Sequence, residues 1–485
     1  MLDYQHFLLF FALCMAASYM SQYGIDLSKI ISHVPGLSDA MDQLSSSAVY
    51  MISDVRLPGR QNSYDITISH GKVSAVEPHE STQPSISHIS GVVEAKGGLL
   101  APSLCHAHVH LDKCFLLQDE KYDDLVISKG DFAEAMSLTG QAKQRFTEED
   151  VMRRAKRLIE ESIEAGVTSM RAFVEMDEVA ETKSLQAAVK LKKQYKDQLD
   201  VQLCAFAQLA VYDDKVGQQR RSYIEDALTS EDIEVIGSTP YVEVTKDKMK
   251  ECVKWSITLA LQHKKHLDFH LDYNIDPEQE PLVWYVLEEL KRQNWKANAL
   301  PSQTICLGHC TRLTLFNRDE WQRLSTQIGN LPISFVGLPT SDLFMMGRPE
   351  GADSQRPRAT LQLPEMAQEY GLHCALSINN IGNAFTPWGP VDPISLVSLG
   401  MGVYQTGTMQ GAELLYNMVS SRAKAAIGLE APLSKDVQVG QIADFVLFMP
   451  SEAHPERVPR SLADVAYGLD VHSRRRTILR GRLSH

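Results

Sequence analysis

Three histidines occupy alternate positions in the segment CHAHVHLDKC, at His106, His108 and His110. In an extended strand, residues two apart lie on one face with a spacing of about 6.6 Å. His108 and His110 can therefore bind one ion together, while His106 lies one layer deeper. Imidazole is a common ligand of zinc and iron, so this spacing predicts a metal site if other strands supply further ligands.

Two more histidines stand near the ends of strand-like runs, His270 in DFHLDY and His309 in LGHC. A parallel barrel gathers its functional groups at the carboxyl ends of its strands. A single buried histidine is usually only a core residue, so the case for His309 is weaker than that for the other three. We predict that His108, His110 and His270 are metal ligands.

The elements that would position these residues are eight strand-like runs that alternate with amphipathic helices. This alternation is typical of parallel βα units, and eight units predict an α/β fold with a closed (β/α)8 TIM barrel. The runs are LLAPSLCHAHVH, TSMRAFVEM, VQLCAFAQ, EVIGSTPYVEV, HLDFHLD, TICLGHC, ISFVGLP and HCALSINN. Between the first two runs, we expect a helix that begins after Thr147 as its N-cap and ends at Gly166.

Short β-rich segments flank this region on both sides. We predict that residues 48–100 and 431–485 form one small composite β-sandwich domain, and that residues 101–430 form the barrel. Residues 1–47 are expected to be an N-terminal extension. Its apolar run, 7–17, is shorter than the roughly 20 residues that cross a bilayer, so we expect no membrane span. No Lys or Arg precedes this run, which makes secretion the less favoured alternative.

The amino-acid composition limits the kinds of molecule that this protein is expected to bind. The 485 residues carry a formal net charge of −13, which argues against a nucleic-acid partner and favours a small neutral or cationic substrate. The eight cysteines show no paired framework and predict reduced thiols in a cytoplasmic protein. Cys306 and Cys310 flank His309, but two thiols without a second pair are a weak zinc pattern. A homo-oligomer is left open.

Several motifs together resemble those of one family. They are HVHLD at 108–112, FAQ at 206–208, HLD at 270–272, GH at 308–309 and VGQIADFVLF at 439–448. From about residue 50 to its end, the chain resembles the amidohydrolase superfamily, and within it the cytosine deaminase-like metal-dependent hydrolases.

This resemblance implies a role for each matching residue. In that family, one Zn or Fe ion is held by the first-strand pair, the strand-five histidine and an aspartate after strand eight. The strand-six histidine polarises the bond under attack, and a strand-three glutamine anchors the substrate. The matching positions are His108, His110, Gln208, His270 and His309. Phe385 and Trp388 would be aromatic pocket residues, with ordinary core packing as an equal alternative.

Two positions depart from the family pattern. Tyr273 stands where the family has a proton-transferring glutamate, and Asn379 stands where it has the metal-binding aspartate. Asn379 can bind a metal through its amide oxygen but cannot accept a proton, and its neutrality should weaken metal binding. Tyr273, with a usual pKa of about 10, transfers protons poorly. General acid and base groups each contribute about 10²- to 10⁴-fold to the rate, so both changes should slow turnover.

Two hypotheses follow for function. The first is hydrolysis of a non-peptide carbon–nitrogen bond in a small cyclic substrate by metal-activated water, as in deamination or cleavage of a ring amide or amidine. The second is a degenerate amidohydrolase that binds a small molecule or catalyses a non-hydrolytic step. Asp112, Glu243, Asp272 and Asp276 could replace the lost carboxylates, although support of neighbouring groups is the favoured role of Glu243 and Asp272. The stretch 340–358 is either a lid or pocket wall, or a solvated loop.

Overall fold

The computed structural model describes residues 48–80, 89–348, 359–430, 436–468 and 473–484. The predicted N-terminal extension, residues 1–47, lies outside the described residues. Within the described part of the chain, no helix has both the length and the apolar character needed to cross a membrane.

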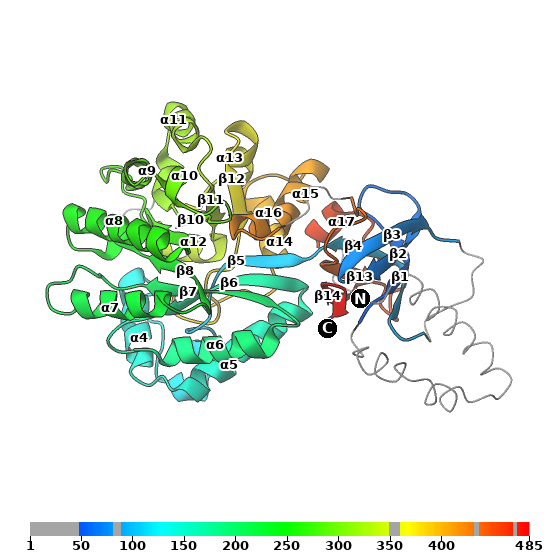
Figure 1. The fold of residues 1–485 in the computed structure, drawn as a ribbon, viewed down its shortest axis with the longest axis horizontal. Coiled ribbons are helices and arrows are strands. Elements are labelled where there is room, and N and C mark those ends of the chain that lie inside the picture. Colours follow the sequence, from blue (N-terminus) through cyan, green and yellow to red (C-terminus); the bar gives the residue numbers. More distant parts are fainter. Residues whose placement is uncertain (1–47, 81–88, 349–358, 431–435, 469–472, 485) are drawn as a thin grey trace.

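The larger part of the molecule is a parallel barrel (Figure 1). Its strands follow one another around the barrel in chain order. They are β5 (Leu104–His110), β6 (Val167–Glu175), β7 (Asp200–Ala207), β8 (Ile233–Ser238), β9 (His266–Leu271), β10 (Ile305–His309), β11 (Ile333–Gly337) and β12 (His373–Leu376). The predicted (β/α)8 barrel is therefore confirmed.

The first and last strands close the barrel through a short seam. Val109 and Asn379 form an isolated parallel bridge. The backbone N–H of His110 donates to the carbonyl of Asn379 at 2.8 Å, and the N–H of Asn379 donates to the carbonyl of His108 at 3.1 Å. The backbone that closes the barrel is thus the backbone of three predicted ligands.

Helices cover the outside of the barrel (Figure 1). The α-helices of the described chain are α4 (Phe132–Lys143), α5 (Glu148–Glu164), α6 (Lys183–Tyr195), α7 (Gly217–Leu228), α8 (Lys246–His263), α9 (Val283–Arg292), α10 (Trp295–Asn298), α11 (Arg318–Ile328), α12 (Pro339–Met345), α13 (Leu363–Glu369), α14 (Ile394–Val403), α15 (Met409–Met418), α16 (Ser421–Ala426) and α17 (Leu462–Ala466). As expected, Thr147 caps α5, because its hydroxyl accepts the N–H of Asp150 at 3.3 Å. Gly166, with φ of 102°, follows the end of that helix.

The smaller part is one seven-stranded sheet built from both ends of the described chain. In the order β15-β14-β13-β4-β1-β2-β3, it joins β1 (Met51–Arg56), β2 (Ser63–Ser69), β3 (Lys72–Pro78), β4 (Val92–Pro102), β13 (Phe445–Met449), β14 (Arg474–Leu479) and β15 (Arg482–Leu483). All pairs are antiparallel except β1 with β4. Two isolated antiparallel bridges, of Ala48 with Arg482 and of Lys72 with Ile442, add contacts between the N-terminal and C-terminal segments of this domain. The domain has a hydrophobic core of its own.

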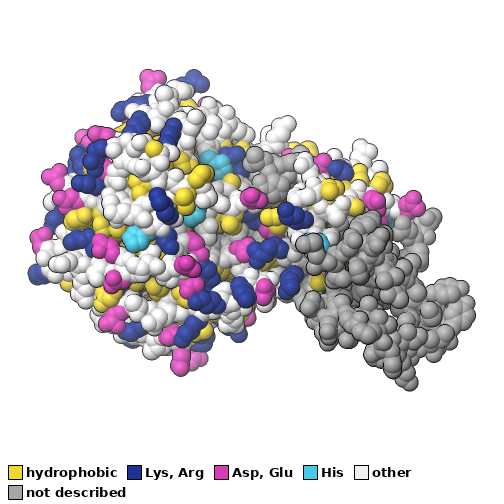
Figure 2. Space-filling model, viewed as in Figure 1, with side chains coloured by type: hydrophobic (Ala, Val, Ile, Leu, Met, Phe, Trp, Pro, Cys, Tyr) yellow, Lys and Arg dark blue, Asp and Glu magenta, His cyan; other side chains and the backbone are white. Residues whose placement is uncertain are grey.

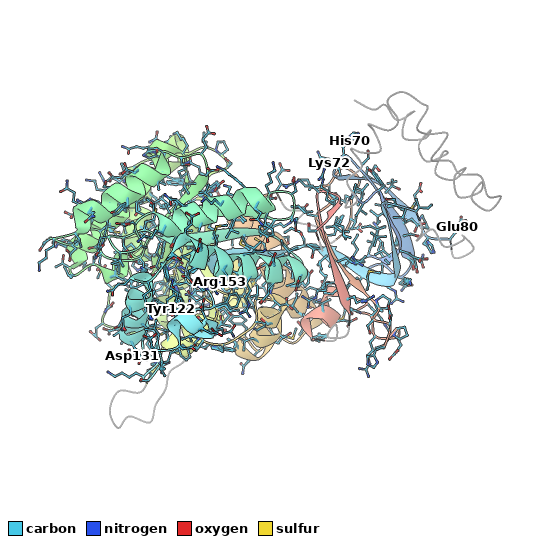
Figure 3. All side chains as sticks on the ribbon, turned by 90° about the horizontal axis from the view of Figure 1, so that it is seen from below. His70, Lys72, Glu80, Tyr122, Asp131 and Arg153 are labelled. Carbon is cyan, nitrogen blue, oxygen red and sulfur yellow. The ribbon has the colours of Figure 1, made fainter. Side chains whose placement is uncertain are left out.

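This sheet lies at the end of the barrel opposite the predicted site. β4 leads directly into the start of β5, and Thr477 of β14 donates to the carbonyl of Ile163, just before β6. In Figure 3, His70, Lys72 and Glu80 mark this sheet, whereas Tyr122, Asp131 and Arg153 lie on the barrel. Figure 2 shows Lys and Arg side chains interspersed with Asp and Glu over the barrel face in view. The surface charge is mixed on that face.

A buried ion pair crosses the interior near the amino ends of the strands. Arg171 of β6 donates to Asp268 of β9 at 3.0 Å, and both side chains are 0% exposed. Arg171 also donates to the side chain of Gln202 at 3.2 Å and lies 3.2 Å from the sulfur of Cys306. Burial raises the pKa of Asp268 to about 7 in spite of Arg171. Through these contacts, Arg171 links four strands, β6, β7, β9 and β10, below the predicted metal site.

We expect Arg171→Leu to lower stability by about 3–5 kcal/mol, because it leaves the Asp268 carboxyl buried without its cation. Arg480→Leu is the matched control, since it removes an exposed pair with Asp200 that contributes about 1 kcal/mol or less. Thermal and denaturant unfolding of both variants measures the difference. Equal losses of stability would contradict this account of the barrel interior.

Candidate metal centre and pocket

The predicted ligands lie together at the carboxyl end of the barrel. His108 and His110 end β5, His270 is near the end of β9, and His309 ends β10. Asn379 follows β12. His309 and Asn379 have left-handed backbone, with φ of 64° and 61°. Non-glycine residues adopt this conformation rarely, and such backbone is concentrated at functional sites.

The four histidine rings form one buried cluster. His108, His270 and His309 each offer a ring nitrogen, and these three atoms lie within 4.8 Å of one another. The ring centre of His110 is 5.3 Å from that of His270 and 5.7 Å from that of His108. All four side chains are almost completely buried. The structure therefore brings together histidines that are up to 201 residues apart in the chain, which is the separation of positions 108 and 309.

The donor atoms of this cluster are buried but unpaired. Within the described residues, no hydrogen-bond partner exists for either ring nitrogen of His108, for Nδ1 of His110, for Nε2 of His270 or for Oδ1 of Asn379. Each unsatisfied buried polar atom costs about 1–3 kcal/mol. A cation that accepted one lone pair from each of these groups would remove most of that cost. The donor set therefore fits a divalent ion of the zinc or iron type.

The rings are also in the protonation state that metals require. Burial is the largest cause that lowers the pKa of His108, His110 and His270 well below the usual value, and neighbouring rings and Lys113 add to it. Neutral imidazole has a free lone pair, and it is the form that binds metal ions.

Asn379 is oriented toward the cluster by its own amide group. Its Nδ2 donates to the hydroxyl of Ser341 at 2.8 Å, and that hydroxyl lies 2.5 Å from the hydroxyl of Thr386. Because the amide nitrogen is bound in this way, Oδ1 is the atom left available. Asn379 can thus offer the neutral oxygen ligand predicted from the sequence.

A small pocket opens beside the cluster. Its lining residues are His110, Lys113, Phe132, Gln208, Tyr241, His270, Tyr273, His309, Asn379, Asn380 and Phe385. Two predicted substrate-binding residues, Gln208 and Phe385, are among them. Trp388 is not, and 45% of it is exposed. No Asp or Glu is among these lining residues.

Tyr273 belongs to an aromatic wall of this pocket. Its ring centre is 3.9 Å from that of His309 and 6.0 Å from those of Phe132 and Tyr241. Asp131, labelled in Figure 3, caps α4 by accepting the N–H of Glu134 at 2.8 Å, which places Phe132 at the start of that helix. Burial raises the pKa of Tyr273 well above its usual value, so its phenol remains neutral.

The carboxylates considered as replacements have other partners. Asp272 accepts the backbone N–H groups of Leu282 and Val283, at 2.7 and 3.0 Å. Glu243 accepts the N–H of Val211 at 2.7 Å, and Asp112 accepts that of Glu175 at 3.0 Å. Asp276 is exposed. The structure thus gives these groups supporting contacts. The thiols of Cys306 and Cys310 are not in the cluster, whose donors are histidines only.

The sequence reasoning missed a buried charge network next to the pocket. Lys113 is paired with Glu175, and Lys143 is paired with both Glu175 and Asp177. These four side chains are at most 5% exposed. The available signal was position, since Lys113 follows His110 by three residues and Asp177 closely follows β6.

Asp342 is a second residue that sequence reasoning missed. It lies in α12, within the stretch 340–358 for which the sequence predicts a lid, pocket wall or loop; residues 349–358 of that stretch lie outside the described residues. Its Oδ1 is 2.8 Å from Nδ1 of His309, and its Oδ2 accepts the hydroxyl of Thr360 at 3.0 Å. A carboxylate just past the end of the seventh barrel strand was the signal that could have identified it.

The geometry defines a barrel with a buried histidine cluster at its carboxyl end, and comparison with known proteins identifies its family. The model of the Amidohydrolase family matches residues 99–483. N-isopropylammelide isopropyl amidohydrolase of Pseudomonas sp. (strain ADP) is 23% identical over 406 residues, which are 82% of this chain and 90% of that protein.

Solved structures show the same fold. The 5-methylcytosine deaminase of Klebsiella pneumoniae, with bound 5-fluorocytosine, has a TM-score of 0.73 at 19% identity and covers 89% of this chain and 96% of its own. N-isopropylammelide isopropylaminohydrolase of Burkholderia multivorans has a TM-score of 0.69 at 17% identity, and the match covers 90% of this chain and 98% of its own. This chain belongs to the amidohydrolase family.

Substitution of Gly308 tests how closely the histidine cluster is packed. A Cβ atom at this position would lie 2.9 Å from Cε1 and 3.1 Å from Nδ1 of His108. We expect Gly308→Ala to displace the His108 ring and weaken zinc binding about 10- to 100-fold, the range seen when support of a metal ligand is lost. Gly402→Ala in α14, where the added methyl group has no neighbour within 4 Å, is the control. The measurement is zinc affinity by competition with a chelator. Equal affinities of the two variants would contradict the packing described here.

Proposed function

We propose that this protein hydrolyses a non-peptide carbon–nitrogen bond of a small cyclic substrate with one divalent metal ion. The observation that carries this proposal is the set of unpaired, buried donor atoms of His108, His110, His270 and Asn379, which converge beside a pocket. Family membership supports it, since the relatives described above are named as an amidohydrolase, an aminohydrolase and a deaminase.

The metal and the pocket have separate tasks in this proposal. A divalent ion of the zinc or iron type lowers the pKa of bound water toward about 7, which makes a nucleophile available at neutral pH. Gln208 hydrogen-bonds the polar edge of the substrate through its amide. Phe132, Tyr241 and Phe385, whose neighbouring ring centres lie 5.7–6.3 Å apart, form an aromatic wall that contacts the substrate and excludes water.

Proton transfer is the weak step of this site. No carboxylate lines the pocket, and the raised pKa of Tyr273 makes the phenol a poor acid and a poorer base. Asn379 cannot exchange a proton. We therefore propose slow hydrolysis rather than loss of it, because the metal ligands are retained.

The surroundings of the site are consistent with a small-molecule enzyme. We propose no nucleic-acid partner, given the net charge of −13. The seven cysteines among the described residues are buried and free, which favours a reducing compartment, and we propose the cytoplasm. A homo-oligomer stays open.

Metal removal and His270→Ala test the proposal. We expect the purified protein to contain one Zn or Fe ion per chain and to release ammonia or an amine from at least one member of a panel of nitrogen heterocycles. Chelation and His270→Ala should each abolish this release, because the Lewis acid is lost. His263→Ala, at the end of α8, is the control and should keep the activity. Full activity in metal-free protein would refute the mechanism.

A second experiment restores the missing carboxylates. For any substrate found, Tyr273→Glu combined with Asn379→Asp should raise kcat at least about 100-fold, because it supplies a proton-transfer group. Tyr273→Gln with Asn379→Asp has nearly the same shape but no carboxylate at position 273, and it should not reproduce the gain. If the unmodified protein turns over as fast as the double variant, proton transfer does not limit it. If only the double variant is active, the degenerate alternative is supported.

A further inference from the structure

We propose that Asp342 supplies the negative charge that the metal site lacks at Asn379, and that it does so by holding His309 as a ligand of the metal together with His108 and His270. This inference rests on the metal site of the proposed function, but not on hydrolysis. It gives His309 a different role from the polarising one implied by the family resemblance.

The first step is the geometry of the donor atoms. The three rings whose nitrogens lie mutually within 4.8 Å are those of His108, His270 and His309. This is a spacing that one ion can bridge after small ring movements, since ligand nitrogens around a tetrahedral zinc ion are about 2.0–2.1 Å from the metal. His110 and Asn379 lie next to this set and remain available to complete it.

The second step is the orientation of His309. Its Nδ1 lies 2.8 Å from the Asp342 carboxylate, and both groups are buried, with 4% and 0% of their side chains exposed. When Asp342 is ionised, it only accepts hydrogen bonds, so in a neutral His309 ring Nδ1 carries the proton and Nε2 presents its lone pair. A ring in this tautomer can bind a metal. To donate to a developing oxyanion, it would need a second proton.

The third step is the charge of Asp342 itself. Among the described residues, its only ion-pair partner is His309. Its other oxygen accepts the hydroxyl of Thr360, which is neutral. A fully buried carboxylate without a cation is strongly unfavourable. A divalent ion bound to the far side of the His309 ring would supply the missing positive charge.

These steps together form a carboxylate–histidine–metal arrangement. Such an arrangement fixes the ring and increases its basicity as a ligand. In the family pattern, the carboxylate binds the metal directly from the end of strand eight. Here, the same charge would act through one imidazole, from the first turn of α12. Asp342 is thus a positioning residue that compensates for the neutral Asn379.

The test is a double-mutant cycle in zinc affinity. Asp342→Asn keeps the shape of the side chain and removes its charge, and we expect zinc binding about 10- to 100-fold weaker, measured by competition with a chromophoric chelator. His309→Gln should also weaken binding. In the His309→Gln background, adding Asp342→Asn should cause no further loss, because Asp342 acts only through that ring. Asp150→Asn, which changes a buried carboxylate on α5, is the control and should bind zinc as the unmodified protein does.

Cobalt substitution gives a readout independent of affinity and of turnover. The visible absorption of the Co²⁺-loaded protein should change in His309→Gln, because a ligand is lost. Unchanged zinc affinity in Asp342→Asn, additive losses in the cycle, or a Co²⁺ spectrum unaffected by His309→Gln would each overturn the proposal. If Asp342→Asn does not fold, the His309→Gln variant alone tests whether His309 is a ligand, through its zinc affinity and its Co²⁺ spectrum. If the zinc-loaded protein shows the predicted cycle but hydrolyses no heterocycle, the inference stands and the proposed function fails.

Discussion

The candidate site depends on how the barrel closes. β5 and β12 meet through the backbone of His108, His110 and Asn379, so the hydrogen bonds that complete the barrel also fix three of the predicted ligands. The hydroxyl of Ser377 reinforces this seam, because it donates to the carbonyl of His108 at 2.6 Å and accepts its N–H at 3.0 Å. A ligand set built on the seam cannot be displaced without opening the barrel, and this explains how buried, unpaired donor atoms are tolerated.

The second feature of the site is where its charges lie. No Asp or Glu side chain lines the pocket surface that a substrate would contact. Asp342 lies behind His309, and Glu175 lies behind Lys113. Groups in such positions can tune a metal or orient a cation, but they cannot exchange protons directly with a bound ring. The arrangement suits metal retention better than rapid proton transfer.

The sequence was sufficient for the fold and for the clustering of the four histidines, because both depend on regular spacing. Alternation of strands and helices identified the barrel, and the positions of His108, His110, His270 and His309 at strand ends predicted that they would meet. Trp388 could not be excluded in this way, because the direction of a loop side chain has no periodicity.

Lys113 and Asp342 were missed for a related reason. Each contacts a partner that lies far away in the chain, Glu175 in one case and His309 in the other. Such contacts arise only when strands and loops are placed in space. The strand order of the small domain was likewise not predictable, since pairing between distant strands is not visible in the sequence.

X-ray absorption at the metal edge of the purified protein tests the central claim most directly. The account predicts one Zn or Fe ion per chain in a shell of nitrogen and oxygen atoms, for zinc at about 2.0–2.2 Å, with the outer scattering of imidazole rings. A protein that binds neither metal, or a shell that contains sulfur at about 2.3 Å from thiols such as Cys306 or Cys310, would contradict it.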